Sequence, residues 1–338
     1  MGWRIRVRHS TGYRYGTPVH QSYNEVRLTP RTDSRQNVIV SRVETTPATR
    51  LYRYTDYWGT AVTAFDLHAP HKELGVVATS VVETGDTQAP VDTAGWSDLA
   101  TDEVRDRHTE MLEFTTYVGQ DKELAKVSRV LRKEKTPVDA VHAAAQWVHE
   151  HLTYQPGSTG VHTSALQAWE AGKGVCQDYV HLTLLLLREA GVPARYVSGY
   201  LFTDRSTGHP GSGHPGGERS DPDATHAWVE VFLPSLRWVG LDPTNNMLAG
   251  ERHVSVAIGR DYGDVPPSRG VYKGDEDSQL VVGVSVRRAR AAAAEPEFMR
   301  LAKPVFIPGA RRRKAGVQAI HHYQEQMSVH QQQQQQQQ

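Results

Sequence analysis

Only one cysteine occurs in the 338 residues of this chain, at position 176. A single cysteine excludes an intramolecular disulfide and any zinc site built from several cysteines. It fits a reducing compartment, where free thiols persist. Cys176 is therefore either a small hydrophobic side chain that happens to lie there or a reactive thiol. The surrounding residues have to decide between the two.

Net charge and long apolar runs are also absent. The 38 basic and 38 acidic residues cancel, so no overall surface for nucleic acid or membranes is expected. The longest apolar run, LTLLLL at 182–187, falls far short of the ~20 residues that span a membrane. The N-terminal stretch MGWRIRVRH alternates charge and bulk, so we expect no signal peptide. A cytoplasmic location, with no nucleic-acid or membrane partner, follows as an expectation.

The first 90 residues predict strands, and the chain length predicts two domains. Residues 3–9, WRIRVRH, alternate with period two, and further alternating runs follow at roughly ten-residue spacing. This pattern indicates an antiparallel β-sandwich over 1–90. Residues 91–120 are polar and turn-rich, and we expect them to be a linker.

Residues 121–290 change from helical to strand patterns, which predicts an α+β domain. Thr136, Pro137 and Asp139 form a helix start, and Gly172 ends a shorter helix. A third helix begins at Cys176, and strand-like runs follow from residue 194.

Two further segments have biased composition. The loop 203–224 is rich in glycine and proline and is predicted to be a flexible lid. Its two histidines are too weak a signal for a metal site, so we expect no metal and no cofactor. Residues 291–338 end in eight glutamines and are predicted to be a disordered tail.

The stretch AGKGVCQDYVH at 171–181 places the cysteine where a glycine-rich turn meets a long apolar helix. The unpaired N–H groups at a helix start favour an anion there and can also stabilise an oxyanion on an attacked carbonyl. The position suits a nucleophile, but an inert cysteine can equally begin a helix. Within the same helix, Asp178 is expected to complement the helix dipole or cap a loop, and His181 to be packed rather than catalytic.

A nucleophilic thiol needs an imidazole and a group that orients it. His226 begins the strand-like run THAWVEVFL, and the next run, RWVGLD, ends at Asp242. If Phe232 pairs with Leu236 in a hairpin, His226 lies directly opposite Asp242. Taken singly, His226 is an ordinary sheet histidine and Asp242 a turn former. Together with Cys176 they form a candidate catalytic triad.

The segments GVCQDYVHL, GVPARYVSGYL, THAWVEVFLPSLRWVGLDPTNN and GRDYGDVPPSRGVYKG resemble the bacterial transglutaminase-like superfamily, which has a papain-like thiol fold. The resemblance spans roughly 1–290 and includes the β-rich N-terminal region of bacterial members. It implies a fold of helices packed on an antiparallel sheet. It also implies that Cys176, His226 and Asp242 are the catalytic cysteine, histidine and aspartate.

By this resemblance, Cys176 attacks an amide or ester carbonyl, His226 transfers the proton, and Asp242 fixes the imidazole. The oxyanion would be held by the Cys176 N–H and one more donor, for which Tyr154 and Gln177 are the candidates. We expect a peptidase or amidase acting on peptide or isopeptide bonds. A transglutaminase that transfers an amine, and a binding or assembly module that keeps the triad as a relic, remain alternatives.

The expected partner is a peptide or protein substrate. The resemblance adds a possible functional link to ATP-grasp proteins that resemble peptide ligases, because such proteins are often encoded beside family members.

Overall fold

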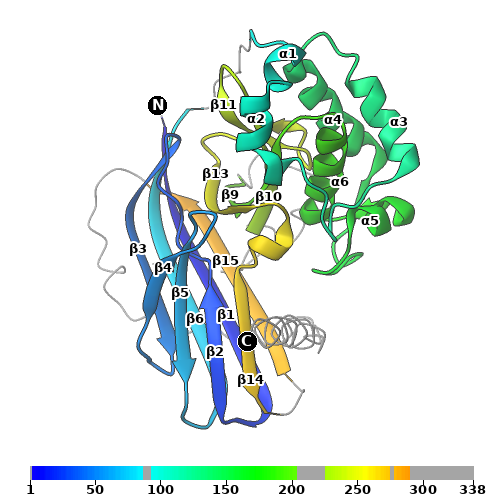
Figure 1. Cartoon of the computed structure of the whole chain (residues 1–338). Coiled ribbons are helices and arrows are strands. Elements are labelled where there is room, and N and C mark those ends of the chain that lie inside the picture. The colour runs from blue at the N-terminus through cyan, green and yellow to red at the C-terminus, as the bar shows by residue number, and fades with distance from the viewer. Residues whose placement is uncertain (1, 87–92, 204–224, 275–277, 290–338) are drawn as a thin grey trace, which may run out of the picture.

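The computed structural model describes residues 2–86, 93–203, 225–274 and 278–289 (Figure 1). It contains a long β-sandwich and a compact unit of helices and sheet at one end of it. The predicted lid, apart from Thr203, and the predicted tail 291–338 lie outside the described residues. Among the helices that are described, none has the length and apolar character needed to cross a membrane.

The sandwich consists of two four-stranded antiparallel sheets, with strand orders β15-β1-β6-β3 and β14-β2-β5-β4. Tyr15, Val26, Phe65 and Leu74 are buried together in its core. This confirms the sandwich predicted from the alternating runs. The strands are β1 (Trp3–Val19), β2 (Gln21–Val26), β3 (Gln36–Thr46), β4 (Tyr52–Thr55), β5 (Ala61–Leu67), β6 (His71–Thr84), β14 (Ser268–Lys273) and β15 (Ser278–Arg288).

The last two strands differ from the predicted domain boundary. Residues 121–290 were assigned to the catalytic domain, but β14 pairs with β2 and β15 pairs with β1. The end of the chain therefore returns to complete both sandwich sheets. Alternation in a sequence identifies a strand but does not reveal a partner more than 200 residues away. The sandwich is thus built from both ends of the described chain.

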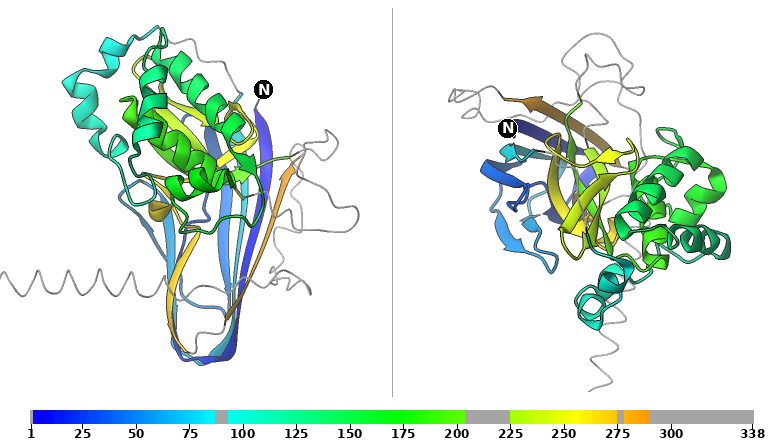
Figure 2. Two further views of the ribbon diagram at one scale, coloured as in Figure 1. Left: turned by 90° about the vertical axis from the view of Figure 1, so that its right-hand side faces the viewer. Right: turned by 90° about the horizontal axis from the view of Figure 1, so that it is seen from above.

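The second unit is built on a five-stranded antiparallel sheet of order β12-β11-β10-β9-β13. It confirms the predicted α+β class. Its strands are β9 (Ala194–Leu201), β10 (Thr225–Leu233), β11 (Arg237–Asp242), β12 (Met247–Leu248) and β13 (His253–Gly259). Seen from above, this sheet lies between the helices and the sandwich (Figure 2). One face therefore packs against each neighbour.

The helices begin and end where the capping residues predict. The Thr136 side chain accepts a hydrogen bond from the Asp139 N–H, and the Asp139 carboxylate accepts one from the Thr136 N–H. Gly172 ends its helix in the left-handed conformation, with a φ of 64°. The central helix, α6, is buried from Gln177 to Arg188. The helices of this part are α3 (Lys122–Leu131), α4 (Pro137–His151), α5 (Ala165–Ala171), α6 (Cys176–Glu189) and the short η3 (Tyr262–Asp264), and a two-stranded parallel sheet joins β7 (Thr153–Tyr154) to β8 (Lys173–Gly174).

The segment 91–120 is more ordered than the predicted linker. Its described part holds α1 (Trp96–Leu99), α2 (Asp102–Arg107) and η1 (Thr109–Met111). Thr101 caps α2 by accepting a hydrogen bond from the Val104 N–H. Leu99, Met111 and Val118 of this segment are buried. These helices are too short to show a periodic pattern in the sequence, which is why they were missed.

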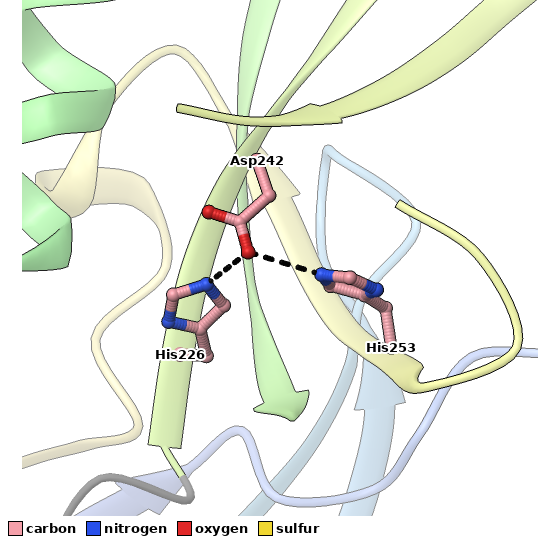
Figure 3. A group of neighbouring side chains, drawn as sticks. All are labelled: His226, Asp242 and His253. Atoms are coloured by element: carbon pink, nitrogen blue, oxygen red, sulfur yellow. Dashed lines mark hydrogen bonds and ion pairs between the residues drawn. The ribbon is translucent and has the colours of Figure 1, made fainter. Parts of the chain in front are cut away.

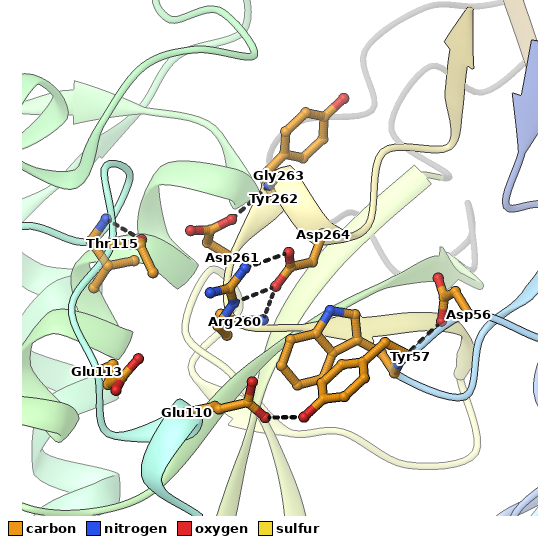
Figure 4. A network of polar contacts seen from close by, with 12 residues as sticks. Asp56, Tyr57, Glu110, Glu113, Thr115, Arg260, Asp261, Tyr262, Gly263 and Asp264 are labelled. Carbon is orange, nitrogen blue, oxygen red and sulfur yellow. Dashed lines mark hydrogen bonds and ion pairs between the residues drawn. The ribbon is translucent and has the colours of Figure 1, made fainter. Parts of the chain in front are cut away.

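Polar contacts join the sandwich to the five-stranded sheet and to η1. The Gln36 side chain donates to the carbonyl oxygens of Arg31 (2.6 Å) and Ser255 (2.8 Å), and its oxygen accepts from the Ser255 N–H (2.8 Å). A second contact lies at the β4–β5 turn, where the Tyr57 hydroxyl donates to Glu110 at 2.8 Å (Figure 4). Gln36 thus attaches the sandwich to β13 of the five-stranded sheet, and Tyr57 attaches it to η1.

Replacing Gln36 with leucine should lower the free energy of unfolding by about 1–3 kcal/mol, because the buried Ser255 N–H loses its acceptor. Gln146→Leu on the exposed face of α4 is the control and should change it by less than about 0.5 kcal/mol. Urea denaturation measures both. Equal effects of the two substitutions would contradict the role assigned to Gln36.

Candidate active site

Cys176 is the first residue of α6 and is half-buried. The turn before it is held by the parallel pairing of β7 with β8, and the Gln155 N–H donates to the Gly174 carbonyl at 2.9 Å. Val175 is extended, so the chain changes from strand to helix in one residue. As the first two residues of α6, Cys176 and Gln177 carry N–H groups for which the helix itself offers no acceptor.

Asp178 closes this turn from inside the helix. Its Oδ2 accepts hydrogen bonds from the Val175 N–H (2.7 Å) and the Thr159 hydroxyl (2.6 Å). The carboxyl is fully buried, and burial raises its pKa although these hydrogen bonds oppose the rise. A Cβ on Gly174 would come within 2.6 Å of Asp178, so only glycine fits there. The expected capping role of Asp178 agrees with these contacts.

His226 and Asp242 come together from neighbouring strands. His226 lies near the start of β10, Asp242 is the last residue of β11, and His226 Nε2 is 2.7 Å from Asp242 Oδ2 (Figure 3). The predicted register was wrong by two residues, because Leu233 pairs with Arg237. The two side chains are therefore diagonal rather than opposite. A shift of two keeps both on the same face of the sheet, so they still meet.

The register differs because of the turn between the strands. The Leu236 N–H donates to the Leu233 carbonyl, and Arg237 follows with a φ of 66°. Arginine seldom adopts this left-handed conformation, and nothing in its local sequence signals it.

Asp242 is a buried carboxylate that is surrounded by donors, and its exposed fraction is 0%. Its Oδ1 accepts from the N–H groups of Thr244 (3.0 Å) and Asn245 (3.2 Å). Its Oδ2 accepts from the Asn245 side chain (2.7 Å) and lies 3.2 Å from Nε2 of His253. Burial alone would raise its pKa, but the charge and hydrogen bond of His226, together with His253, hold the pKa well below the usual range.

His226 is held in its protonated form. Burial lowers its pKa, but the Asp242 charge and hydrogen bond outweigh burial, and a hydrogen bond with Cys176 acts in the same direction. The net result raises the pKa of His226 from 6.5 to about 10. Because Nε2 faces Asp242, the other ring nitrogen, Nδ1, is left for the thiol. The structure therefore brings together all three residues of the predicted triad.

His226, Asp242 and His253 also offer three ligand atoms within 4.8 Å of one another, a spacing at which side chains can hold a metal ion. Two ligands of one zinc ion lie about 3.3 Å apart when each is ~2.0–2.1 Å from the metal in tetrahedral geometry. The 2.7 Å contact between His226 and Asp242 is shorter than this and matches a charge-assisted hydrogen bond. The His226–Asp242 contact therefore has the geometry of a hydrogen-bonded ion pair.

The two oxyanion candidates differ in how they are placed. The Gln177 side chain donates to the carbonyls of Gly160 (3.5 Å) and Val161 (3.3 Å), so it holds the loop beside the turn. Tyr154 lies in β7, paired with Gly174, and is 39% exposed. Its place beside the Cys176 turn keeps it as a candidate donor.

His181 is packed, as expected, rather than catalytic. It is fully buried, and its Nε2 accepts from the Tyr262 N–H at 3.2 Å. Its ring lies 5.3 Å from that of Tyr196. Burial lowers its pKa to about 3, so it stays neutral at physiological pH.

The sequence reasoning missed two polar residues of the site, Asn245 and His253. Asn245 follows Asp242 by three residues in the run DPTNN, which is a recognisable turn signal. His253 has no such signal, because it lies in β13, two strands from β10 in the sheet.

Family comparisons agree with this geometry. Residues 124–243 match the core of the transglutaminase-like superfamily, and residues 5–83 match the bacterial transglutaminase-like N-terminal region. This chain belongs to the transglutaminase-like superfamily. The core match runs from α3 to one residue beyond Asp242, so it contains the whole candidate triad.

Similar chains occur in mycobacteria. A Mycobacterium leprae protein described as uncharacterized is 47% identical over 286 residues, which cover 85% of this chain and 99% of that one. One from Mycobacterium tuberculosis, also described as uncharacterized, is 34% identical over 302 residues, 84% of this chain and 92% of that one. A solved structure from Cytophaga hutchinsonii, provisionally described as a cysteine protease, has a TM-score of 0.67 at 20% identity, over 87% of this chain and 93% of that one. It shows the same fold.

Gly174→Ala should lower the free energy of unfolding by about 1–3 kcal/mol, because the new methyl group displaces the Asp178 cap. Gly160→Ala is the matched control, since a Cβ there meets nothing within 4 Å. Thermal unfolding compares the two. Equal stability of both variants would mean that the turn tolerates a side chain at 174.

Asp242→Asn should slow the alkylation of Cys176 by iodoacetamide at pH 7 by roughly tenfold or more. Without the carboxylate charge the pKa of His226 falls, and the Cys176 sulfur loses its cationic neighbour. The gap between variant and wild type should close as the pH rises through about 10, where wild-type His226 also loses its proton. The single cysteine makes the labelling site-specific.

Asp66→Asn is the control for this experiment, because Asp66 also pairs with a histidine, His68, but in the sandwich. It should leave the alkylation rate unchanged. A wild-type rate at pH 7 no faster than that of Asp242→Asn would refute the ion pair.

Proposed function

We propose that this chain is a cysteine-dependent acyl-transfer enzyme that cleaves peptide or isopeptide amides through a thioester on Cys176. The observation that carries the proposal is a buried series of hydrogen bonds, which joins Asp242 to His226 and His226 to the thiol at the start of α6. A cysteine that only filled space would not need a protonated imidazole held against it by a buried carboxylate.

The first half of the reaction uses the thiolate and the imidazolium. The Cys176 sulfur attacks the amide carbon, and the carbonyl oxygen becomes an oxyanion beside the first N–H groups of α6. The C–N bond then breaks, and His226 donates its Nδ1 proton to the leaving amine. A thioester and a neutral imidazole remain. Asp242 keeps the imidazole in place throughout, because four other donors fix the position of its carboxylate.

The second half reverses the proton transfer. Neutral His226 takes a proton from water, and the hydroxide attacks the thioester carbon. The C–S bond breaks, the carboxylic acid leaves, and the thiolate–imidazolium pair is restored. An amine in place of water would give a new amide instead.

We propose water as the usual acceptor, and transfer to an amine as the second candidate. A Pseudomonas aeruginosa protein named protein-glutamine gamma-glutamyltransferase is 34% identical to this chain over 101 residues, which cover 28% of this chain and 14% of that protein. This local similarity supports amine transfer as the second candidate reaction. A peptide or protein substrate fits either reaction, and the expected cytoplasmic location stays a prediction.

Cys176→Ala should abolish turnover, with a loss of several orders of magnitude in kcat, because no other thiol exists to form the acyl-enzyme. Libraries of peptides and isopeptides, each with and without an added primary amine, supply the substrates. Mass spectrometry separates an acid product from an amide product. Full activity in Cys176→Ala would overturn the proposed function, and a wild-type chain that binds peptides without turnover would favour the binding module.

A further inference from the structure

His253 contacts Asp242 from the side opposite to His226 (Figure 3). It is the first residue of β13, and only 3% of its side chain is exposed. Its ring meets that of Trp228 edge to face, with centroids 5.1 Å apart. The side chain therefore has no access to a substrate and touches the triad through the carboxylate.

The hydrogen bonds of His253 determine which of its nitrogens carries the proton. The Gly250 N–H donates to Nδ1 at 3.1 Å, so Nδ1 bears a lone pair. The proton of the neutral ring is then on Nε2, which donates to Asp242 Oδ2 at 3.2 Å. Burial lowers the pKa of His253, and the positive His226 adds to this, although Asp242 and Glu251 oppose it. The ring is therefore neutral at physiological pH.

We propose that His253 is a positioning residue for the acyl-transfer reaction, whose Nε2–H fixes Asp242 Oδ2 in the orientation that receives His226. The inference rests on the proposed function. A carboxylate can rotate about its Cβ–Cγ bond, and this rotation moves both oxygens together, so donors on Oδ2 add to those on Oδ1 in holding one orientation of the group. The second imidazole and Asn245 hold Oδ2 from two other sides.

The sandwich supports this arrangement through the turn that precedes β13. The Thr84 hydroxyl at the end of β6 donates to the Glu251 carbonyl at 2.7 Å, and Thr84 is buried. The Phe202 N–H donates to the Arg252 carbonyl at 2.9 Å, and the guanidinium of Arg252 lies 5.4 Å from the Trp3 ring centroid. The N-terminal domain thereby holds the backbone that positions His253. It contributes to the active site without reaching the substrate.

Two variants that differ by one methylene group test the proposal. In His253→Gln the amide nitrogen can occupy the place of Nε2 and still donate to Asp242, whereas in His253→Asn it occupies the place of Nδ1 and cannot reach. We expect His253→Asn to lower kcat about tenfold with KM unchanged, and His253→Gln to stay within about threefold of wild type. His71→Gln is the control, because His71 is a buried histidine of the sandwich, and its kcat should not change.

His253→Phe covers the case in which the asparagine variant fails to fold, because phenylalanine matches the ring in size but has no donor. A residue that only fills space would be replaced better by phenylalanine than by glutamine. Phenylalanine activity equal to or above that of glutamine would therefore overturn the inference, as would equal kcat in the asparagine and glutamine variants.

The outcome separates this inference from the proposed function. If Cys176→Ala is inactive while His253→Asn, or His253→Phe in its place, keeps wild-type kcat, only the role of His253 fails. If Cys176→Ala is active, the function itself fails. The alkylation rate of Cys176 in the His253 variants gives a readout without substrate. At pH 7 it should fall in His253→Asn but not in His253→Gln.

Discussion

The carboxylate of Asp242 is the constraint on which the rest of the site depends. It is fully buried, and an isolated charge there would be costly, because removing one partner of a buried ion pair typically costs about 3–5 kcal/mol. Two backbone N–H groups, one side-chain amide and two imidazoles form hydrogen bonds with the carboxylate and offset this cost. Only one of these partners, His226, becomes charged. The protonated imidazole is thus the counter-ion that the buried carboxylate requires, and the thiol lies on its other nitrogen.

The two domains share the work of building this site. The helical side of the five-stranded sheet supplies α6, whose buried body fixes the position of the half-buried Cys176 at its start. The sandwich side supplies contacts to the strands and turns around His253, through Gln36 and Thr84. The helices and the sandwich thus contact opposite parts of the unit that holds Cys176, His226 and Asp242. The β-rich domain contacts the strand and the turn that carry His253.

Much of this arrangement could be predicted from the sequence, because local signals are strong there. The caps at Thr136 and Gly172 and the helix start at Cys176 depend on neighbouring residues alone. The pairing of His226 with Asp242 was predicted from side-chain alternation, and it survives an incorrect register because a shift of two preserves the face. The membership of β14 and β15 in the sandwich, and the contact of His253 with Asp242, depend on long-range pairing. No local pattern encodes either of them.

Nitrogen-15 NMR of the histidine side chains tests the central claim most directly, with the His226 signals assigned by their loss in His226→Gln. The account predicts that both ring nitrogens of His226 carry protons throughout neutral pH and that the imidazolium titrates near pH 10. A His226 that loses its proton near its ordinary pKa of 6.5 would contradict it, because the buried carboxylate would then not be holding an imidazolium against the thiol.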